Sequence, residues 1–233
     1  MENQSEIEEV FELAEEAYKK ESYKEALKLF NKVIESVDIP NKNQKIEHIM
    51  YRSWNYIGKM YEEGNGVKQD TWKAIECYYK SNEIGRYSIA EMFRYTDLID
   101  REGEKAIETF TKYEDWVMIG LMYRDGIGTE QNGEKAIEYF TKAEDWYLIG
   151  TMYENGDEVE QDSQKAIEYY TKAGDWHSIG NMYRYGDSIK QDGQKAIEYF
   201  TKAEDWLSIA EMYRKGIGVA KDEKKAMEYE NKK

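Results

Sequence analysis

Apolar residues recur along this chain at helical spacing, in two patterns that alternate. The first pattern sets four residues at i, i+3, i+4 and i+7, on one face of a helix: Trp146, Ile149, Gly150 and Tyr153. The second pattern is a stripe at i, i+4 and i+7: Ala136, Phe140 and Ala143. Both patterns are short, so the chain is predicted to alternate between two kinds of short helix.

Polar residues and glycines mark where these helices begin and end. Asp145 stands just before the first pattern as an N-cap, and Gly156 follows it as a C-cap. Four residues stand before copies of the second pattern as N-caps: Asn132, Asp162, Asp192 and Asp222. The boundaries therefore predict a helix-turn-helix hairpin.

The hairpin returns with a fixed period. Four tryptophans stand 30 residues apart: Trp116, Trp146, Trp176 and Trp206. More degenerate copies begin around Met60 and Met92. A single hairpin of this length cannot bury its apolar face, but stacked neighbours share a core. We therefore expect an all-α solenoid of about seven hairpins, in which the tryptophans pack between neighbours.

One repeat position in the first helix, called here the small address, always holds a glycine or an alanine, which predicts that two helices cross closely there. It holds Gly150 in the copy quoted above and elsewhere Gly58, Ala90, Gly120, Gly180 and Ala210. A larger side chain there is expected to overpack the crossing. The last copy carries Glu230 where the others carry an aromatic ring, as a polar end without a further neighbour would.

The N-terminal part has a different sequence pattern. Residues 14–36 read as a helix-turn-helix with its own packing set: Ala14, Tyr18, Tyr23, Ala26, Phe30 and Ile34. Residues 39–44 interrupt the pattern with proline, asparagine and lysine, and a long helix is expected over 45–63. We expect one solenoid domain over 1–233, with an N-terminal hairpin at 1–38 and six repeats over 45–233.

Charge and cysteine content narrow the function. Lys and Arg number 33 against 48 Asp and Glu, a net charge of −15. This balance disfavours nucleic acid and anionic membranes as partners and favours a protein or peptide, especially a basic one. We see no signal peptide and no apolar run of membrane-spanning length. The single cysteine, Cys77, excludes an internal disulfide and favours the reducing cytoplasm.

Residues 60–81, "MYEEGNGVKQDTWKAIECYYKS", resemble a Sel1-like repeat, a relative of the tetratricopeptide repeat. The pattern returns at 212–230, and 14–36 resemble a tetratricopeptide hairpin. The copies here are shorter than is usual for that family. The resemblance implies a right-handed α-solenoid whose inner face, lined by the first helices, holds another protein. It implies an adaptor or scaffold and no catalysis.

An arginine recurs directly after the Met-Tyr or Met-Phe pair of the first helix. The four copies are Arg94, Arg124, Arg184 and Arg214. Four guanidinium groups at one address could line a groove that grips carboxylates in bidentate fashion. The alternative is that each arginine pairs with acids of a neighbouring hairpin.

Other positions vary while their surroundings repeat. One first-helix address holds Leu121, Thr151, Asn181 and Glu211, and a second set includes Met118 and Tyr147. Variation within a fixed frame suggests surface exposure and partner contact, most of all for the apolar members. For the polar members, unconstrained sequence variation at solvent-exposed positions explains the pattern equally well.

Candidate chemistry is sparse. The acidic loop 156–162 lacks the ligand spacing of a calcium loop, and neither His48 nor His177 has a ligand partner at a metal-site spacing. We expect no catalytic residues, no metal and no cofactor. The leading reading is a protein-binding scaffold. The alternative is an acidic inhibitor or immunity-type protein that masks a basic surface, and homodimerisation through the terminal repeats stays open.

Overall fold

The computed structural model describes residues 4–37, 43–82, 85, 88, 89, 92 and 98–232, the side chains of 98 and 99 excepted. All regular elements within these residues are α-helices. The chain divides into two compact units, Met1–Asp97 and Leu98–Lys233. The all-α repeat fold is confirmed, and the continuity of one array through both units stays a prediction.

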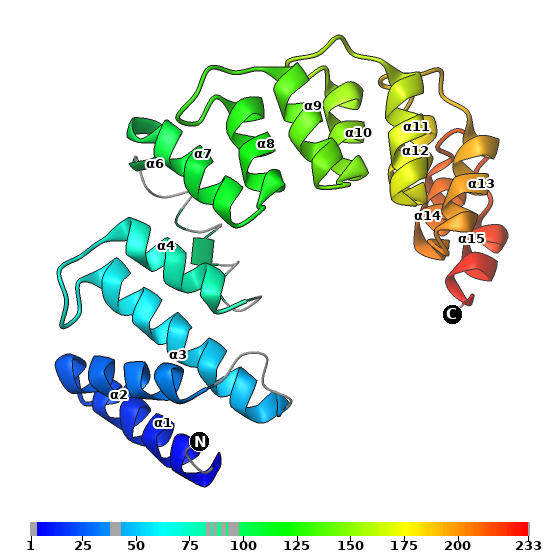
Figure 1. Ribbon diagram of the computed structural model, residues 1–233. Helices are drawn as coiled ribbons and strands as arrows, with labels where there is room; N and C mark the ends of the chain where they lie inside the picture. Colours follow the sequence, from blue (N-terminus) through cyan, green and yellow to red (C-terminus); the bar gives the residue numbers. More distant parts are fainter. Residues whose placement is uncertain are drawn as a thin grey trace. The chain divides into compact units, whose positions relative to one another are not determined.

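The first unit holds two described hairpins (Figure 1). Its helices are α1 (Gln4–Lys19), α2 (Tyr23–Ser36), α3 (Gln44–Glu63) and α4 (Thr71–Lys80). Tyr56 of α3 joins the hairpins, because its ring stacks on Phe30 at 4.8 Å and lies 4.9 Å from Tyr18. The helix-turn-helix expected over 14–36 is present. The expected interruption at 39–44 lies largely outside the described residues.

The second unit repeats one hairpin along the chain (Figure 1). Its helices are α6 (Leu98–Arg101), α7 (Gly103–Lys112), α8 (Trp116–Asp125), α9 (Gly133–Lys142), α10 (Trp146–Asn155), α11 (Ser163–Ala173), α12 (Trp176–Tyr185), α13 (Gly193–Lys202), α14 (Trp206–Lys215) and α15 (Glu223–Glu230). From α8 onward, each first helix packs mainly on the second helix that follows it. Within this unit α8, α10, α12 and α14 share one side of the row (Figure 1).

The helix boundaries follow the predicted caps. The Asp145 carboxylate accepts a hydrogen bond from the backbone N–H of Leu148 at 3.1 Å, and Gly156 ends α10 with φ of +78°. The N-caps of α9, α11, α13 and α15 also accept bonds from their helices. From α8 onward, a loop of seven residues joins the two helices of a hairpin, and only two or three residues join one hairpin to the next. Successive first helices are therefore placed by tight turns.

At the small address, an aromatic ring of the second helix packs against the backbone of the first helix. A Cβ added at Gly120 would lie 2.4 Å from the Phe140 ring, and one at Gly150 would lie 2.7 Å from the Tyr170 ring. Such distances are shorter than van der Waals contact, so only glycine fits beside the ring. In the last hairpin Glu230 replaces the ring, and Ala210 is accommodated with 1% exposure. Ala90, the remaining alanine at this address, lies outside the described residues.

The tryptophans are half-buried and stack within their own hairpins. Each ring lies 6.2–6.3 Å from a tyrosine of the following helix: Tyr139, Tyr169, Tyr199 and Tyr229. Trp146 and Trp176 also pack on core clusters that span neighbouring hairpins. These clusters are not one unbroken core. Tyr153 and Tyr183 connect them, because each packs against two clusters at once.

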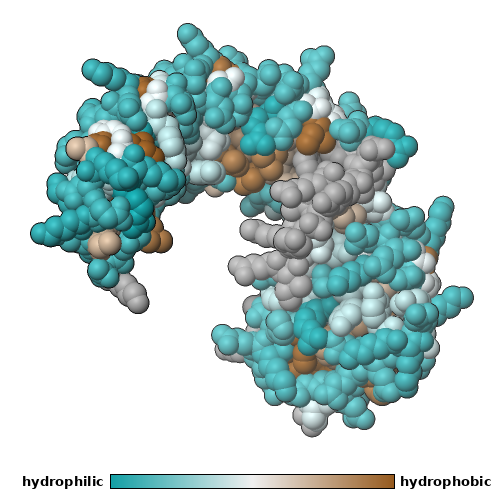
Figure 2. Space-filling view, turned by 180° about the vertical axis from the view of Figure 1, so that it is seen from behind, coloured by the Kyte–Doolittle hydropathy of each residue, from teal (hydrophilic) through white to brown (hydrophobic). Residues whose placement is uncertain are grey.

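The C-terminal hairpin closes with polar groups, as expected. Glu230 accepts an ion-pair contact from Arg214 at 2.8 Å, and only Ala226 of α15 is buried. The visible face of the molecule is mostly hydrophilic, with apolar side chains gathered in small patches (Figure 2). None of the helices in the described part of the chain is long and apolar enough to cross a membrane.

Candidate interaction surface on the first helices

The outward sides of α8, α10, α12 and α14 form a surface that we call the first-helix face. The residues directly after the tryptophans differ from copy to copy, and those of α10, α12 and α14 protrude, whereas Val117 of α8 is half-buried. Tyr147 is 47% exposed and Leu207 is 71% exposed, and the side chain of His177 is 53% exposed. The face therefore repeats in backbone and varies in chemistry. It contains two clefts that differ sharply, one between α8 and α10 and one between α12 and α14.

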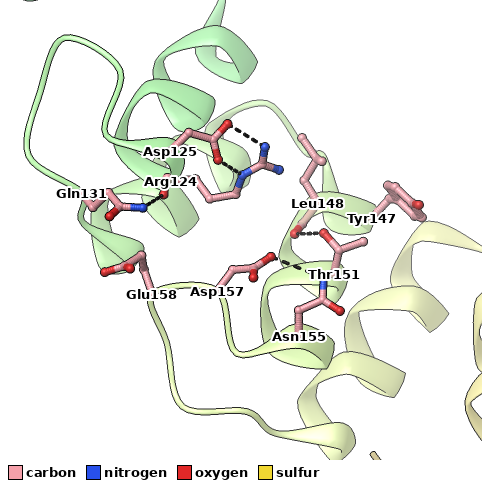
Figure 3. A pocket seen from close by; sticks show the side chains of 9 residues that line it. All are labelled: Arg124, Asp125, Gln131, Tyr147, Leu148, Thr151, Asn155, Asp157 and Glu158. Atoms are coloured by element: carbon pink, nitrogen blue, oxygen red, sulfur yellow. Dashed lines mark hydrogen bonds and ion pairs between the residues drawn. The ribbon is translucent and has the colours of Figure 1, made fainter. Parts of the chain in front are cut away.

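The α8–α10 cleft is open (Figure 3). It encloses a pocket of about 490 Å³. Nine residues line this pocket: Arg124, Asp125, Gln131, Tyr147, Leu148, Thr151, Asn155, Asp157 and Glu158. They come from α8, α10 and the loops that follow these two helices. A concave site with polar groups on its walls is the kind of surface that receives a ligand side chain.

Arg124 lines this cleft and pairs with the next residue of its own helix, Asp125 (Figure 3). Its Nε lies 2.6 Å from Asp125 Oδ1 and its Nη2 lies 2.8 Å from Oδ2, a bidentate pair. The hydrogen bonds to the Asp125 carboxylate raise the pKa of the guanidinium, and the two opposite charges offset each other. Across the cleft, the Thr151 hydroxyl donates to the Leu148 carbonyl at 2.8 Å and reaches no side chain of α8.

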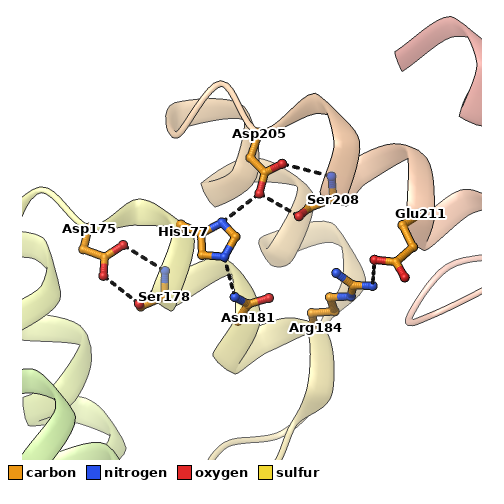
Figure 4. Close-up of polar contacts among 8 residues, drawn as sticks. All are labelled: Asp175, His177, Ser178, Asn181, Arg184, Asp205, Ser208 and Glu211. Carbon is orange, nitrogen blue, oxygen red and sulfur yellow. Dashed lines mark hydrogen bonds and ion pairs between the residues drawn. The ribbon is translucent and has the colours of Figure 1, made fainter. Parts of the chain in front are cut away.

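The α12–α14 cleft is closed by an ion pair (Figure 4). Arg184 is 4% exposed, and its Nη2 lies 2.5 Å from Oε2 of Glu211 on the next first helix. Lys215 contacts the other Glu211 oxygen at 2.6 Å. Hydrogen bonds from Lys215 and Arg184 lower the pKa of Glu211 to about 2. The Arg184 guanidinium also lies 4.9 Å from the centre of the Tyr185 ring, a cation–π distance.

A second bridge crosses the same cleft (Figure 4). His177 Nδ1 lies 2.7 Å from Asp205 Oδ2, and its Nε2 lies 2.8 Å from the Asn181 amide nitrogen. Asp205 is the N-cap of α14 and accepts from the Ser208 backbone N–H at 3.0 Å. Desolvation opposes ionisation of Asp205, but hydrogen bonds from Ser208 and His177 outweigh it and lower its pKa. The imidazole thus ties α12 to the start of α14.

The repeat pattern is matched by a family model named Sel1 repeat. It covers five stretches, which make up more than half of the chain: 55–85, 117–145, 147–175, 177–205 and 206–229. The chain belongs to the Sel1 repeat family. The copy expected around Met92 is not among the matched stretches, so five of the six expected Sel1 repeats are matched.

Two solved structures are similar to this Sel1 repeat protein. One is a Sel1 repeat protein from Oxalobacter formigenes, with 23% identity, a TM-score of 0.45, and coverage of 95% of this chain and 97% of that one. The other is c5321, a protective antigen of uropathogenic Escherichia coli with an SLR fold, with 18% identity and a TM-score of 0.46. The match covers 95% of this chain but only 55% of c5321. No curated protein matches the chain.

The predicted arginine row is split among three environments in the Sel1 repeats. Of the three arginines of this row that the structure describes, only Arg184 pairs with an acid of the neighbouring hairpin. Arg124 pairs with Asp125 of its own helix, and Arg214 pairs within its hairpin with Glu223 at 3.2 Å and Glu230 at 2.8 Å. Arg94 lies outside the described residues. The three described guanidinium groups thus all have internal carboxylate partners.

The variable addresses are also unequal. Thr151 and Tyr147 line the open pocket, and Asn181 and Glu211 belong to the bridges of the closed cleft. Leu121 is half-buried against the core cluster around Ile149. The expected exposure of Met118 is wrong, because its side chain is only 8% exposed. A long thioether can fold onto the helix packing at an address where shorter serines stay half-buried.

Sequence reasoning missed the acidic wall of the open pocket. Asp157 was considered only as part of an acidic loop, although it follows the Gly156 cap and lines the pocket with Glu158. The usable signal was the position of Asp157 and Glu158 directly after the Gly156 cap, at the end of the helix that forms one wall of the pocket. Among the described residues, no group of three or more His, Cys, Asp or Glu side chains could hold a metal ion.

Proposed function

We propose that this Sel1 repeat protein is an adaptor or scaffold that binds a protein or peptide on its first-helix face. Sel1 repeats supply a frame for protein interaction rather than a reaction centre. Each hairpin adds a small contact area, and several small contributions sum on a preorganised backbone. The proposal includes no catalytic role.

One observation carries this proposal. Residues at one repeated address, directly after the tryptophan, protrude from α10, α12 and α14 with three different chemistries: a phenol, an imidazole and an aliphatic side chain. These side chains are about half exposed or more, although the Tyr147 ring also contacts the Tyr170 ring and His177 also contacts Asp205. A set of unlike, protruding side chains on a rigid frame is what recognition of a specific partner requires.

Site-specific photocrosslinking in the native host tests the proposal. A benzophenone amino acid replaces Tyr147 or Leu207 on the first-helix face, and Met227 on α15 serves as the matched control because it is 54% exposed. We expect one partner to crosslink at both first-helix positions and not at Met227. The same crosslinked species at all three positions, or crosslinks at Met227 alone, would exclude the first-helix face as the binding surface.

The net charge of −15 favours one alternative, an acidic inhibitor that masks a basic surface of its partner. Salt dependence separates the two functions. Affinity that rests on charge masking falls steeply as ionic strength rises, whereas affinity that rests on buried aromatic and aliphatic anchors changes little. Partner affinity measured at about 0.05 and about 0.5 M salt therefore discriminates between them, because the Debye length shrinks several-fold across this range.

We also propose that the protein works in a reducing compartment, the cytoplasm. The one cysteine of the sequence, Cys77, is 6% exposed, and burial raises the pKa of its thiol to about 11. A buried, protonated thiol behaves as a small apolar side chain rather than as a disulfide partner. Localisation of the tagged protein by cell fractionation tests this.

A further inference from the structure

The closed α12–α14 cleft shows how this repeat frame holds a guanidinium group. Arg184 occupies the space between two first helices, where the Glu211 carboxylate neutralises it and the Tyr185 ring lies beside it. The group is almost completely buried despite its charge. A carboxylate and an aromatic ring between adjacent first helices thus form a seat for a guanidinium.

The open α8–α10 cleft lacks both groups at the equivalent positions, where it has Thr151 and Asp125. Its other carboxylates and its ring come from Asp157, Glu158 and Tyr147. Arg124, at the address of Arg184, is paired with Asp125. Thr151, at the address of Glu211, is too short to draw Arg124 across, and its hydroxyl is used by the Leu148 carbonyl. The pocket of about 490 Å³ is the space that remains (Figure 3).

The charges on the pocket wall favour a cation. The charges of Arg124 and Asp125 cancel, and the wall carries two further carboxylates, Asp157 and Glu158. Asp157 makes one long contact, 3.4 Å from the Asn155 amide nitrogen, and its charge helps to raise the pKa of Arg124 in the same wall. Neither Asp157 nor Glu158 forms a direct ion pair among the described residues. A carboxylate ligand would meet Arg124 already neutralised and two like charges nearby, which opposes its binding.

The remaining wall favours a flat cation on an apolar stem. Tyr147 presents a half-exposed ring, and Leu148 adds an aliphatic surface beside it. A guanidinium can stack on a phenol ring while it forms two parallel hydrogen bonds with one carboxylate. An ammonium group satisfies the charge but not this planar geometry.

We propose that the α8–α10 pocket receives an arginine side chain of the partner polypeptide, with Asp157 as the pairing carboxylate and Tyr147 as the stacking ring. This inference rests on the proposed scaffold function, and it specifies which side chain of the partner binds at one place on the first-helix face. The arginine of the partner enters between α8 and α10, the pair of first helices that corresponds to the pair closed by Arg184.

The test uses the full chain and three peptide probes. The nine-residue peptides are capped, otherwise composed of glycine and alanine, and carry one central Arg, Gln or Glu. Two-dimensional NMR records amide shifts during titration. We expect the Arg peptide alone to shift Tyr147, Thr151 and Asp157 saturably, and Asp157→Asn to weaken that binding about fivefold, as loss of one partly buried charge pair does.

Asp187→Asn is the matched control, because Asp187 holds the same address one repeat later and is exposed. This variant should bind the Arg peptide as the unsubstituted chain does. Equal weakening by both variants, or shifts spread over the whole acidic surface, would show unspecific attraction and overturn the proposal. So would the absence of saturable shifts, or a stronger response to the Glu peptide. Crosslinking at Tyr147 and Leu207 that persists in Asp157→Asn would then leave the scaffold function standing without the arginine seat.

Discussion

The two clefts of the first-helix face begin from the same residue at the same address and end in opposite states. Arg184 crosses to the next hairpin, is 4% exposed, and closes the α12–α14 cleft with Glu211. Arg124 stays on its own helix with Asp125 and leaves the α8–α10 cleft open. The backbone frame is shared, since both clefts lie between first helices 30 residues apart. The difference therefore lies in a few side chains.

Two substitutions between the copies account for the contrast. The acid that receives Arg184 is Glu211, and Thr151 stands at its address in the open cleft. The residue after the arginine is Tyr185 in the closed cleft, which offers a ring, and Asp125 in the open one, which offers a competing carboxylate. A repeat frame can thus close one interface with an ion pair and leave an equivalent interface open without any change of fold.

The largest expected effect tests the shared frame itself. Gly120→Ala places a Cβ where the Phe140 ring lies 2.4 Å away, so we expect a loss of about 2 kcal/mol in the free energy of unfolding. Urea denaturation followed by circular dichroism measures it. In a Phe140→Leu background the added cost should shrink, because the clash partner is smaller. An unchanged urea midpoint in Gly120→Ala would mean that this helix crossing, and with it the common frame of the two clefts, is misplaced.

The next effect separates the two ion pairs. Glu211→Gln leaves the Arg184 guanidinium buried without its counter-ion, and we expect the free energy of unfolding to fall by about 2 kcal/mol. This is less than the loss of a fully buried pair would cost, because Glu211 is partly exposed. Asp125→Asn breaks a more exposed pair and should cost less than about 1 kcal/mol. Thermal and urea unfolding of the two variants, side by side, measure the difference. Equal losses would abolish the distinction between a closed and an open cleft.

Acid titration of stability sharpens the same contrast. The folded pKa of Glu211 is about 2, below its ordinary value near 4.5. A carboxyl with a depressed folded pKa contributes stability that is fully present above the unfolded pKa and is lost as pH falls toward the folded pKa. We therefore expect the Arg184–Glu211 pair to lose its contribution between about pH 4.5 and about pH 2.

Unfolding curves recorded at several pH values in this window measure the effect. The Glu211→Gln variant lacks the titrating group, so its stability should fall less steeply with acid than that of the unsubstituted chain. Asp125→Asn is the control and should leave this slope nearly unchanged. Parallel acid curves for Glu211→Gln and the unsubstituted chain would show that the closing pair does not titrate as the structure implies.

The contrast also shows where sequence reasoning succeeds and where it stops. Hairpins, caps and the small address are local or periodic features, so Asp145, Gly156 and Gly150 were placed correctly from spacing alone. The state of each arginine depends on rotamers and on partners at very different separations, since Asp125 directly follows Arg124 whereas Glu211 lies 27 positions from Arg184. Periodicity gives these arginines one address and cannot assign them different partners.

Backbone strain was equally hidden. Glu114, Glu144 and Glu204 adopt φ near +55° in the turn before a first helix, a left-handed conformation that favours glycine. Gly174 stands at the same address with φ of +71°. The sequence offered this clue, because one glycine alternates there with three glutamates, but only the structure shows the conformation that they share.

The smallest effect converts one cleft toward the other. Thr151→Glu supplies a carboxylate at the address of Glu211, and we expect Arg124 to leave Asp125 and cross the cleft. The net gain in stability should be only about 0.5 kcal/mol, since one partly exposed pair replaces another. A double-mutant cycle with Arg124→Gln isolates the new coupling, which is read from urea midpoints. Zero coupling would mean that Asp125, and not the short threonine, keeps the cleft open. The control that separates these causes is the same cycle in an Asp125→Asn background, where Arg124 has no competing acid and the coupling should rise.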